Sequence, residues 1–245
     1  MKKVGMLSFV VASFLSAATL NFYCGVTMSK AMKDIIKKFQ EKHPDVKIRM
    51  ITGSSGMLLR KLENAKRADL YLPGSDEFIN KKSYLFPYKK EIGYNQLKIF
   101  VTKGNPKNVK TLRDFIRNDI KVGLGSDRSS VGKTAKEVLI RYGGDEFYKK
   151  VRKKAQIFLA SKSLISALAG FEPEIDAALN WRAVYYWGNN RKKVDYIDIP
   201  ERYAPKRKLV IATTIYSKNQ DLAKEFVDLS ASPWGQKVMK KWGLK

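Results

Sequence analysis

The stretch VKIRMITGSSGMLLRKLENAKRADLYL, residues 46–72, carries the pattern that decides the fold. Residues 46–52 have the composition of a strand, residues 55–64 have the apolar spacing of an amphipathic helix, and residues 68–74 form a short apolar run. A strand followed by a helix and another strand is typical of an α/β fold with largely parallel sheets. We therefore expect helices to begin where strands end.

The same alternation extends over the rest of the chain. Further strands are predicted at residues 20–26, 98–106, 120–125, 175–181 and 209–217, and further helices at 29–43, 111–119, 131–144, 163–171, 221–229 and 235–245. Extended crossovers are expected near residues 94–101 and 205–214. These features predict an α/β protein of two lobes, each a mostly parallel sheet flanked by helices, joined by a two-strand hinge.

The lobes are assigned from the positions of the crossovers. Lobe 1 is expected to comprise residues 19–96 and 209–245, and lobe 2 residues 97–208. In folds of this class, ligands bind in clefts outside the carboxyl ends of the strands. A cleft between the lobes is therefore the expected binding site.

The beginning of the chain has the layout of a secretory signal peptide. Two lysines precede an apolar run from Val4 to Leu15, and the small residues 16–18 follow. The run is too short for a comfortable membrane span. We expect residues 1–18 to be a signal peptide cleaved near Ala18, and the mature protein to be soluble and periplasmic.

The chain is strongly basic. It has 48 Lys and Arg residues against 23 Asp and Glu residues, a formal net charge of +25. Such a surface attracts anions of every size. The basic residues are spread along the whole chain, however, which favours a solvated surface over nucleic-acid binding. An exported, adhesin-like module that binds polyanions remains an alternative, and its affinity would collapse with salt.

Four predicted helices begin with hydroxyl residues directly after a strand. A single such residue is explained by helix capping, because a serine at the N-cap satisfies one of the unpaired N–H groups of the first turn. Four such starts, two in each lobe, could converge on a common anion, which would be held by hydroxyls, backbone N–H groups and helix dipoles. The four pairs are Thr27 with Ser29, Ser54 with Ser55, Ser129 with Ser130, and Ser161 with Ser163.

One of these starts, GSDRSSVGKT at residues 125–134, resembles a nucleotide-binding P-loop. That motif requires a glycine five residues before the Gly-Lys pair. Asp127 occupies this position, and an acidic residue is unsuitable where phosphates must approach. The P-loop interpretation is therefore rejected.

An enzyme that acts on phosphorylated or sulfated substrates is a further alternative with little support. His43, the single histidine, lies at a predicted helix end, and Cys24, the single cysteine, lies in an apolar run and is interpreted as a buried small hydrophobe. No cluster has the spacing of metal ligands. We expect no catalytic residue, no cofactor and no protein-ligated metal cation.

At the helix starts the chain also resembles a known family, the periplasmic molybdate-binding proteins of ABC importers. The similarity covers nearly the whole mature chain, and GSSGMLLRKLENAKRADLYL is its most specific part. The other stretches that carry it are CGVTMSKAMKDIIKKFQEKHPDVKI, EIGYNQLKIFVTKGNP, SSVGKTAKEVLIRYG and SPWGQKVMKKWGL. The resemblance implies a two-lobed fold that closes on a tetrahedral oxyanion.

The resemblance also implies residue roles. The two ligand hydroxyls fall on Thr27, where the family usually has serine, and on Ser55, and the backbone donors fall on Val131 and Leu164. Where the family often offers a tyrosine hydroxyl, this chain has Arg182. A guanidinium facing the cleft would suit phosphate, sulfate, thiosulfate or a small organic anion.

Together these observations predict a solute-binding protein of an ABC importer that takes a tetrahedral oxyanion, with molybdate or tungstate favoured. A site made only of donors disfavours a protonated anion, whose O–H finds no acceptor; Asp127 would remove this preference if it turned inward. The expected partners are the oxyanion and a membrane permease, and the expected state is a monomer. The predicted binding residues are Thr27, Ser54, Ser55, Ser130, Val131, Leu164 and Arg182.

Overall fold

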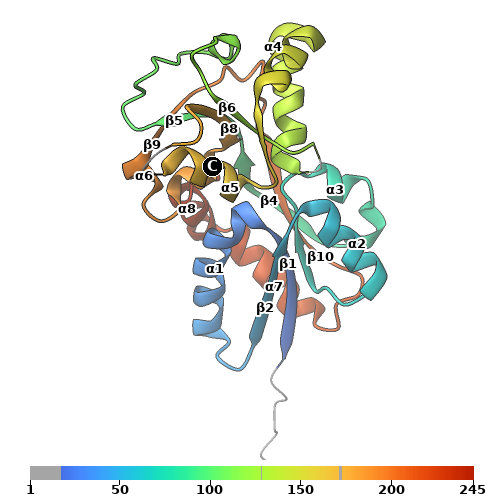
Figure 1. Ribbon diagram of the computed structural model, residues 1–245. Coiled ribbons are helices and arrows are strands. Elements are labelled where there is room, and N and C mark those ends of the chain that lie inside the picture. The colour runs from blue at the N-terminus through green and yellow to red at the C-terminus, as the bar shows by residue number, and fades with distance from the viewer. Residues whose placement is uncertain (1–17, 128, 171–172) are drawn as a thin grey trace, which may run out of the picture.

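The computed structural model describes residues 18–245 apart from residues 128, 171 and 172. Figure 1 shows two bodies, each built on one sheet with helices packed against it. The predicted signal peptide lies outside the described residues except for Ala18. No helix in the described part of the chain is both long and apolar enough to cross a bilayer.

The first sheet has five strands in the order β2-β1-β3-β10-β4. Strand β1 pairs in parallel with β2 and β3, whereas β10 runs antiparallel to β3 and β4. Its strands are β1 (Thr19–Gly25), β2 (Lys47–Gly53), β3 (Leu70–Leu72), β4 (Lys89–Asn95) and β10 (Arg207–Thr213). The helices of this body are α1 (Ser29–Lys42), α2 (Ser55–Ala65), α3 (Glu77–Asn80), α7 (Gln220–Ala231) and α8 (Pro233–Lys241).

The second sheet repeats this plan in the order β7-β6-β8-β5-β9. Strand β6 is parallel to β7 and β8, whereas β5 is antiparallel to β8 and β9. Its strands are β5 (Leu97–Thr102), β6 (Val122–Gly125), β7 (Gln156–Phe158), β8 (Ala177–Trp181) and β9 (Val194–Ile197), and its helices are α4 (Ser130–Lys154), α5 (Ser161–Ala169) and α6 (Asn190–Lys193).

The two-lobed α/β fold predicted from the sequence is confirmed, but each sheet is mixed and not mostly parallel. The strands that lead into and out of the crossovers run against their neighbours, as β10 and β5 do. The sequence analysis missed β7 and β9 and recognised β4 only as part of an extended crossover. The glycine pair at 143–144 interrupts α4 where the sequence predicted a helix end: both glycines have non-helical backbone angles, with Gly144 at φ 78°, and a second helical segment follows to Lys154.

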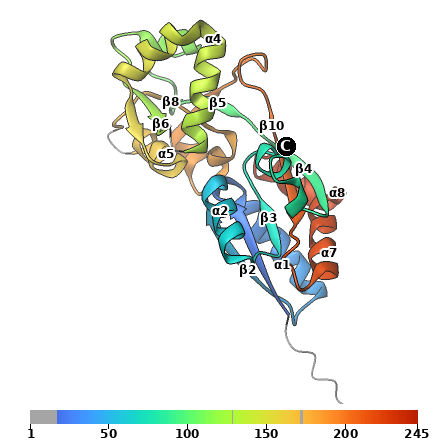
Figure 2. The same cartoon turned by 90° about the vertical axis from the view of Figure 1, so that its right-hand side faces the viewer.

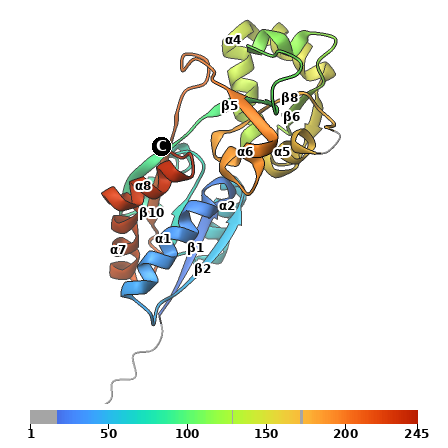
Figure 3. The same ribbon diagram turned by 90° about the vertical axis from the view of Figure 1, so that its left-hand side faces the viewer.

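Two connections join the sheets. The chain passes from β4 to β5 through Gln96 and returns from β9 to β10 through residues 198–206. Figures 2 and 3 show both connections on the same side of the molecule, and the pairing of Asn95 with Arg207 holds them together on the first sheet. This arrangement leaves the starts of α1 and α2 facing those of α4 and α5.

Each sheet packs against its own hydrophobic core. Phe100, Phe115 and Leu139 belong to the core of the second body, and Phe22, Met32 and Phe226 to that of the first. Cys24 is fully buried in the first core, as predicted, and this burial raises the pKa of its thiol.

Candidate functional site

A cavity of about 150 Å³ lies between the two bodies. Four of the strand-to-helix junctions that line it, two from each sheet, are the hydroxyl-bearing helix starts named in the sequence analysis, and Gly74 adds the junction between β3 and α3. The lining residues are Gly25, Val26, Thr27, Gly53, Ser54, Ser55 and Gly74 from the first body, and Ser129, Ser130, Val131, Leu159, Ala160, Ser161 and Lys162 from the second.

Ser55, the first residue of α2, is held on two sides. Its Oγ accepts a hydrogen bond from the backbone N–H of Gly74 at 2.9 Å, and its carbonyl accepts one from the hydroxyl of Tyr71 at 2.9 Å. Burial, with a smaller contribution from Glu63, raises the pKa of Tyr71, so this hydroxyl keeps its proton and remains a donor. Ser55 is itself only 4% exposed. Its position is therefore fixed by the fold.

Thr27 lies in a short 3₁₀ helix, Val26–Met28, between β1 and α1. Its Oγ1 donates to the sulfur of Met28 at 3.0 Å and accepts a long hydrogen bond of 3.4 Å from the side chain of Asn95. Asn95 is the last residue of β4, next to the connection between the sheets. Thr27 is thus coupled to the hinge as well as to the cavity.

The start of α4 brings the second body to the cavity. Ser129 caps the helix, since its Oγ accepts from the N–H of Gly132 at 3.1 Å and donates to the carbonyl of Ser126 at 2.7 Å. Within the part of the chain that the structure describes, no acceptor is found for the backbone N–H groups of Ser130 and Val131. The N–H groups of a helix's first turn have no intrahelical partner, so this helix start presents donors toward the cavity.

Gly132 allows α4 to begin so close to the sheet. A Cβ at this position would lie 2.2 Å from the carbonyl oxygen of Ser126 and 2.4 Å from that of Gly125. Real Cβ contacts are not this short, so only glycine fits without movement of the backbone. Close packing of the helix start on β6 is what brings Ser130 and Val131 to the cavity.

The start of α5 supplies the fourth junction, but not through the predicted residue. The N–H of Leu164 already donates to the carbonyl of Ala160 at 3.1 Å, and its side chain is fully buried. Leu164 does not line the cavity, so its prediction as a backbone donor is wrong. The residues of this turn that reach the cavity are Ser161 and Lys162.

Arg182 does not line the cavity either. It follows β8, and its Nε donates to the carbonyl of Gly243 at 2.7 Å, while its guanidinium lies 4.9 Å from the ring centre of Tyr94. The side chain therefore turns toward the C-terminal segment of the first body. The prediction that it faces the ligand is corrected accordingly.

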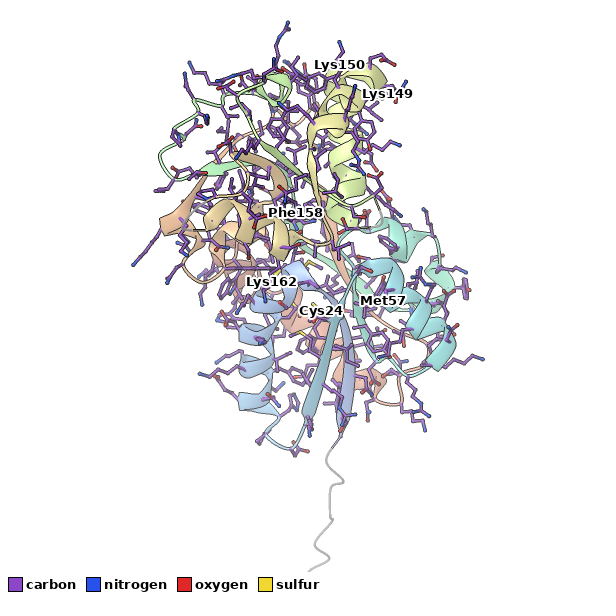
Figure 4. All side chains as sticks on the ribbon, in the orientation of Figure 1. Cys24, Met57, Lys149, Lys150, Phe158 and Lys162 are labelled. Atoms are coloured by element: carbon purple, nitrogen blue, oxygen red, sulfur yellow. The ribbon has the colours of Figure 1, made fainter. Side chains whose placement is uncertain are left out.

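Lys162 and Leu159 were missed by the sequence analysis. Figure 4 shows Lys162 where the two bodies meet, whereas Lys149 and Lys150 lie toward the far end of α4. Leu159 is 84% exposed although it is a large apolar residue. Lys162 stands between two hydroxyl residues that had been singled out, in the sequence SKS at 161–163, so its position in the first turn of α5 could have been noticed.

The cavity has no acidic lining among the described residues. The carboxylate of Asp127 faces away, toward the hydroxyl of Tyr148 at 3.5 Å and the guanidinium of Arg152 at 4.0 Å. The carboxylate of Asp176 lies at the second sheet, where it accepts a hydrogen bond from the N–H of Lys121 at 2.7 Å. The described lining of the cavity therefore offers hydroxyl and backbone N–H groups and no carboxylate.

A second cavity, of about 210 Å³, adjoins the first and shares Ser55, Gly74 and Ser130 with it. Arg207 at its edge connects the two bodies. One guanidinium nitrogen lies 3.0 Å from Glu77 of α3 and the other contacts Glu137 of α4. This bridge crosses the interface beside the candidate site.

No histidine, cysteine or carboxylate side chain lines the cavity among the described residues. His43 lies at the end of α1, where it stacks on Phe39 and approaches Glu225 at 3.1 Å. In the described residues, no three His, Cys, Asp or Glu side chains are grouped so as to hold a metal ion.

Comparisons with known proteins agree with this arrangement. A Haemophilus influenzae protein whose name describes it only as a binding protein is 25% identical over 242 residues, covering 96% of this chain and 95% of its own length. Among solved structures, the periplasmic molybdate-binding protein of Azotobacter vinelandii is similar with a TM-score of 0.76 at 12% identity, covering 92% of this chain and 98% of that one.

A second solved structure, PEB3 of Campylobacter jejuni with L-phospholactate bound, has a TM-score of 0.72 at 21% identity and covers 91% of this chain and 98% of that one. At these identities the two structures establish the fold alone. The family described as bacterial extracellular solute-binding protein matches residues 20–245. The chain belongs to this family of extracellular solute-binding proteins.

Proposed function

We propose that this protein is the exported binding component of an ABC importer and that it captures a tetrahedral oxyanion between its two bodies, with molybdate and tungstate as the leading ligands. One observation carries the proposal. Four helix starts, two from each sheet, line one cavity of about 150 Å³. Helix N-termini offer N–H donors and a partial positive charge to an anion.

The absence of a carboxylate among the described lining residues favours a fully ionised dianion. Ser130 and Val131 offer backbone N–H groups, and Thr27 and Ser55 offer hydroxyl groups. No described residue lining the cavity carries a carboxylate that could accept a proton from the ligand. Such a site favours molybdate, tungstate or sulfate over hydrogen phosphate. The related folds that hold molybdate or a phosphate ester are consistent with a tetrahedral centre.

Binding would bring the bodies together. A ligand that touches helix starts of both sheets makes its full set of contacts only when the bodies meet, so it shifts the population toward the closed conformation. The closed complex would then be recognised by a membrane permease. In this proposal residues 1–18 direct export to the periplasm, and the protein is not an enzyme.

Calorimetric titration of the mature protein with molybdate, tungstate, sulfate, thiosulfate and phosphate tests the proposal. We expect molybdate and tungstate to bind most tightly. A buried site should keep most of its affinity at high salt, whereas binding of polyanions to the basic surface should be lost. If none of the five anions binds, the proposal is wrong.

A further inference from the structure

The second cavity contains charged groups that the proposed oxyanion site does not use. It lies directly beside the first cavity, with Ser55, Gly74 and Ser130 common to both. Its other lining residues are Ser75, Glu77, Phe78, Lys81, Lys133, Thr134, Glu137, Trp181 and Arg207. A ligand in the first cavity could therefore extend into the second without leaving the interface.

Helix α4 presents one continuous face to the second cavity, and Ser130 at its start also lines the first. Ser130, Lys133, Thr134 and Glu137 follow the spacing i, i+3, i+4, i+7, which places them on the same side of a helix. All four line the second cavity. The Gly-Lys-Thr sequence that resembled part of a P-loop thus supplies a lysine and a hydroxyl beside the first turn of α4.

The acidic groups of the second cavity are already paired. Arg207 binds Glu77 through one nitrogen and Glu137 through the other, and its own side chain is 17% exposed. Lys81 and Lys133, by contrast, have no carboxylate within 4.0 Å among the described residues. Three basic and two acidic side chains line the cavity, so the uncompensated charge is positive.

We propose that the second cavity is an anion subsite, so that the cleft takes a tetrahedral oxyanion group that carries a carboxylate on a short arm. The inference rests on the proposed function for the oxyanion group. Lys133 and Thr134 of α4 and Lys81 after α3 would hold the carboxylate. Because Lys81 and Lys133 come from different bodies, this second anionic group would also favour closure. A small phosphorylated or sulfonated carboxylic acid is therefore a further ligand class of the cleft, beside the inorganic oxyanions of the proposed function.

Two probes of nearly equal size test the subsite. Phosphoglycolate and ethyl phosphate carry the same phosphate ester, but only the former has a carboxylate. We titrate each into the mature protein at pH 8, where the phosphate group is fully ionised. Charged hydrogen bonds of ordinary strength should make phosphoglycolate bind roughly tenfold tighter or more.

Lys133→Gln is the decisive variant, and Lys136→Gln is its matched control. Both lysines are exposed on α4, but Lys136 lies over the ring of Tyr148 at 5.3 Å and does not line the cavity. Lys133→Gln should remove most of the preference for phosphoglycolate and leave ethyl phosphate nearly unchanged. Lys136→Gln should alter neither affinity.

The outcomes separate the two proposals. If phosphoglycolate and ethyl phosphate bind equally well, the subsite is excluded while the oxyanion site stands. A loss of affinity for both probes in Lys133→Gln would likewise exclude a carboxylate subsite, because the lysine would then act only through general charge. If neither probe nor any inorganic oxyanion binds, the proposed function itself fails.

Discussion

The two halves of the cavity look alike in sequence but differ in structure. In the first body, Ser55 is 4% exposed and is fixed by hydrogen bonds to Gly74 and Tyr71. In the second body, Leu159 is 84% exposed and Lys162 is also exposed beside it. The hydroxyl of Ser55 in the first half is therefore prearranged, whereas Leu159 and Lys162 in the second half are still solvated.

The largest expected effect comes from removing the prearranged hydroxyls. Thr27→Ala combined with Ser55→Ala should remove two hydrogen bonds to a charged ligand, each contributing about 1.5–3 kcal/mol. The affinity for tungstate, measured by calorimetry, should fall by roughly 100-fold or more.

A serine outside the cavity provides the control for the double variant. Ser163 belongs to a helix start, but its Oγ pairs with the backbone of Ala160 and it does not line the cavity. Ser163→Ala should leave the affinity unchanged.

In the Thr27→Ala, Ser55→Ala double variant, the N–H of Gly74 loses its hydrogen-bond acceptor, which should lower the free energy of unfolding by about 1 kcal/mol. An unaltered tungstate affinity would show that the first half is misassigned.

A pair of glycine substitutions sharpens the comparison between the halves. Gly132→Ala places a Cβ against two carbonyl oxygens of the second body, so the start of α4 must move. Overpacking of this kind costs about 1–3 kcal/mol, and the displaced donors of Ser130 and Val131 should weaken ligand binding as well. Thermal unfolding and calorimetry measure the two effects.

Gly56→Ala is the corresponding change in the first body. There the nearest atom to a Cβ belongs to Phe78, at an ordinary distance of 3.6 Å. Because alanine is the better helix former, stability should rise by up to about 1 kcal/mol. Equal destabilisation by the two alanine substitutions would contradict the account of close packing at Gly132.

The smallest effect is expected at the bridge between the bodies. Glu137→Gln removes one arm of the Arg207 contact, whose acidic groups are about half exposed. Exposed pairs contribute about 0.2–1 kcal/mol, so affinity for every oxyanion should fall by a few-fold or less, and the difference should shrink at high salt. Calorimetry in low-salt and high-salt buffers measures it.

Glu146→Gln is the matched control on the same helix. Glu146 pairs with Lys149 within α4 and not across the interface. It should leave the affinity unchanged in both buffers. An equal loss in both variants would mean that the bridge does not stabilise the closed arrangement.

The helix starts were predictable because capping is local chemistry. Hydroxyl residues next to a strand end identified the junctions of Thr27, Ser55 and Ser130, and the structure brings all three to one cavity. Strand direction was less predictable. β4 begins with exposed charged residues and β9 lies in a polar stretch, so neither shows the apolar run of a buried strand.

The errors at Arg182 and the omission of Arg207 have the same physical origin. Arg182 meets Gly243, which is 61 residues away, and Arg207 meets Glu77 and Glu137 over still longer separations. Long side chains contact residues that only the tertiary structure brings near, and a local sequence pattern does not predict these contacts. The prediction for Leu164 was wrong for a local reason. The N–H groups at the very start of a helix have no partner within it, but the N–H of Leu164, a few residues later, already donates to Ala160.

The contact between Arg182 and Gly243 ties the second body to the first close to the connecting strands. Any rocking of one body on the other would pivot near this anchor, and residues distant from it would sweep the longest arc. The kinked helix α4 extends from the cleft to the far end of its body, where Lys149 and Lys150 lie. A small rotation at the ligand would displace the outer turns of α4 more than any residue near the pivot. A spectroscopic reporter attached to these turns would therefore detect the rotation most sensitively.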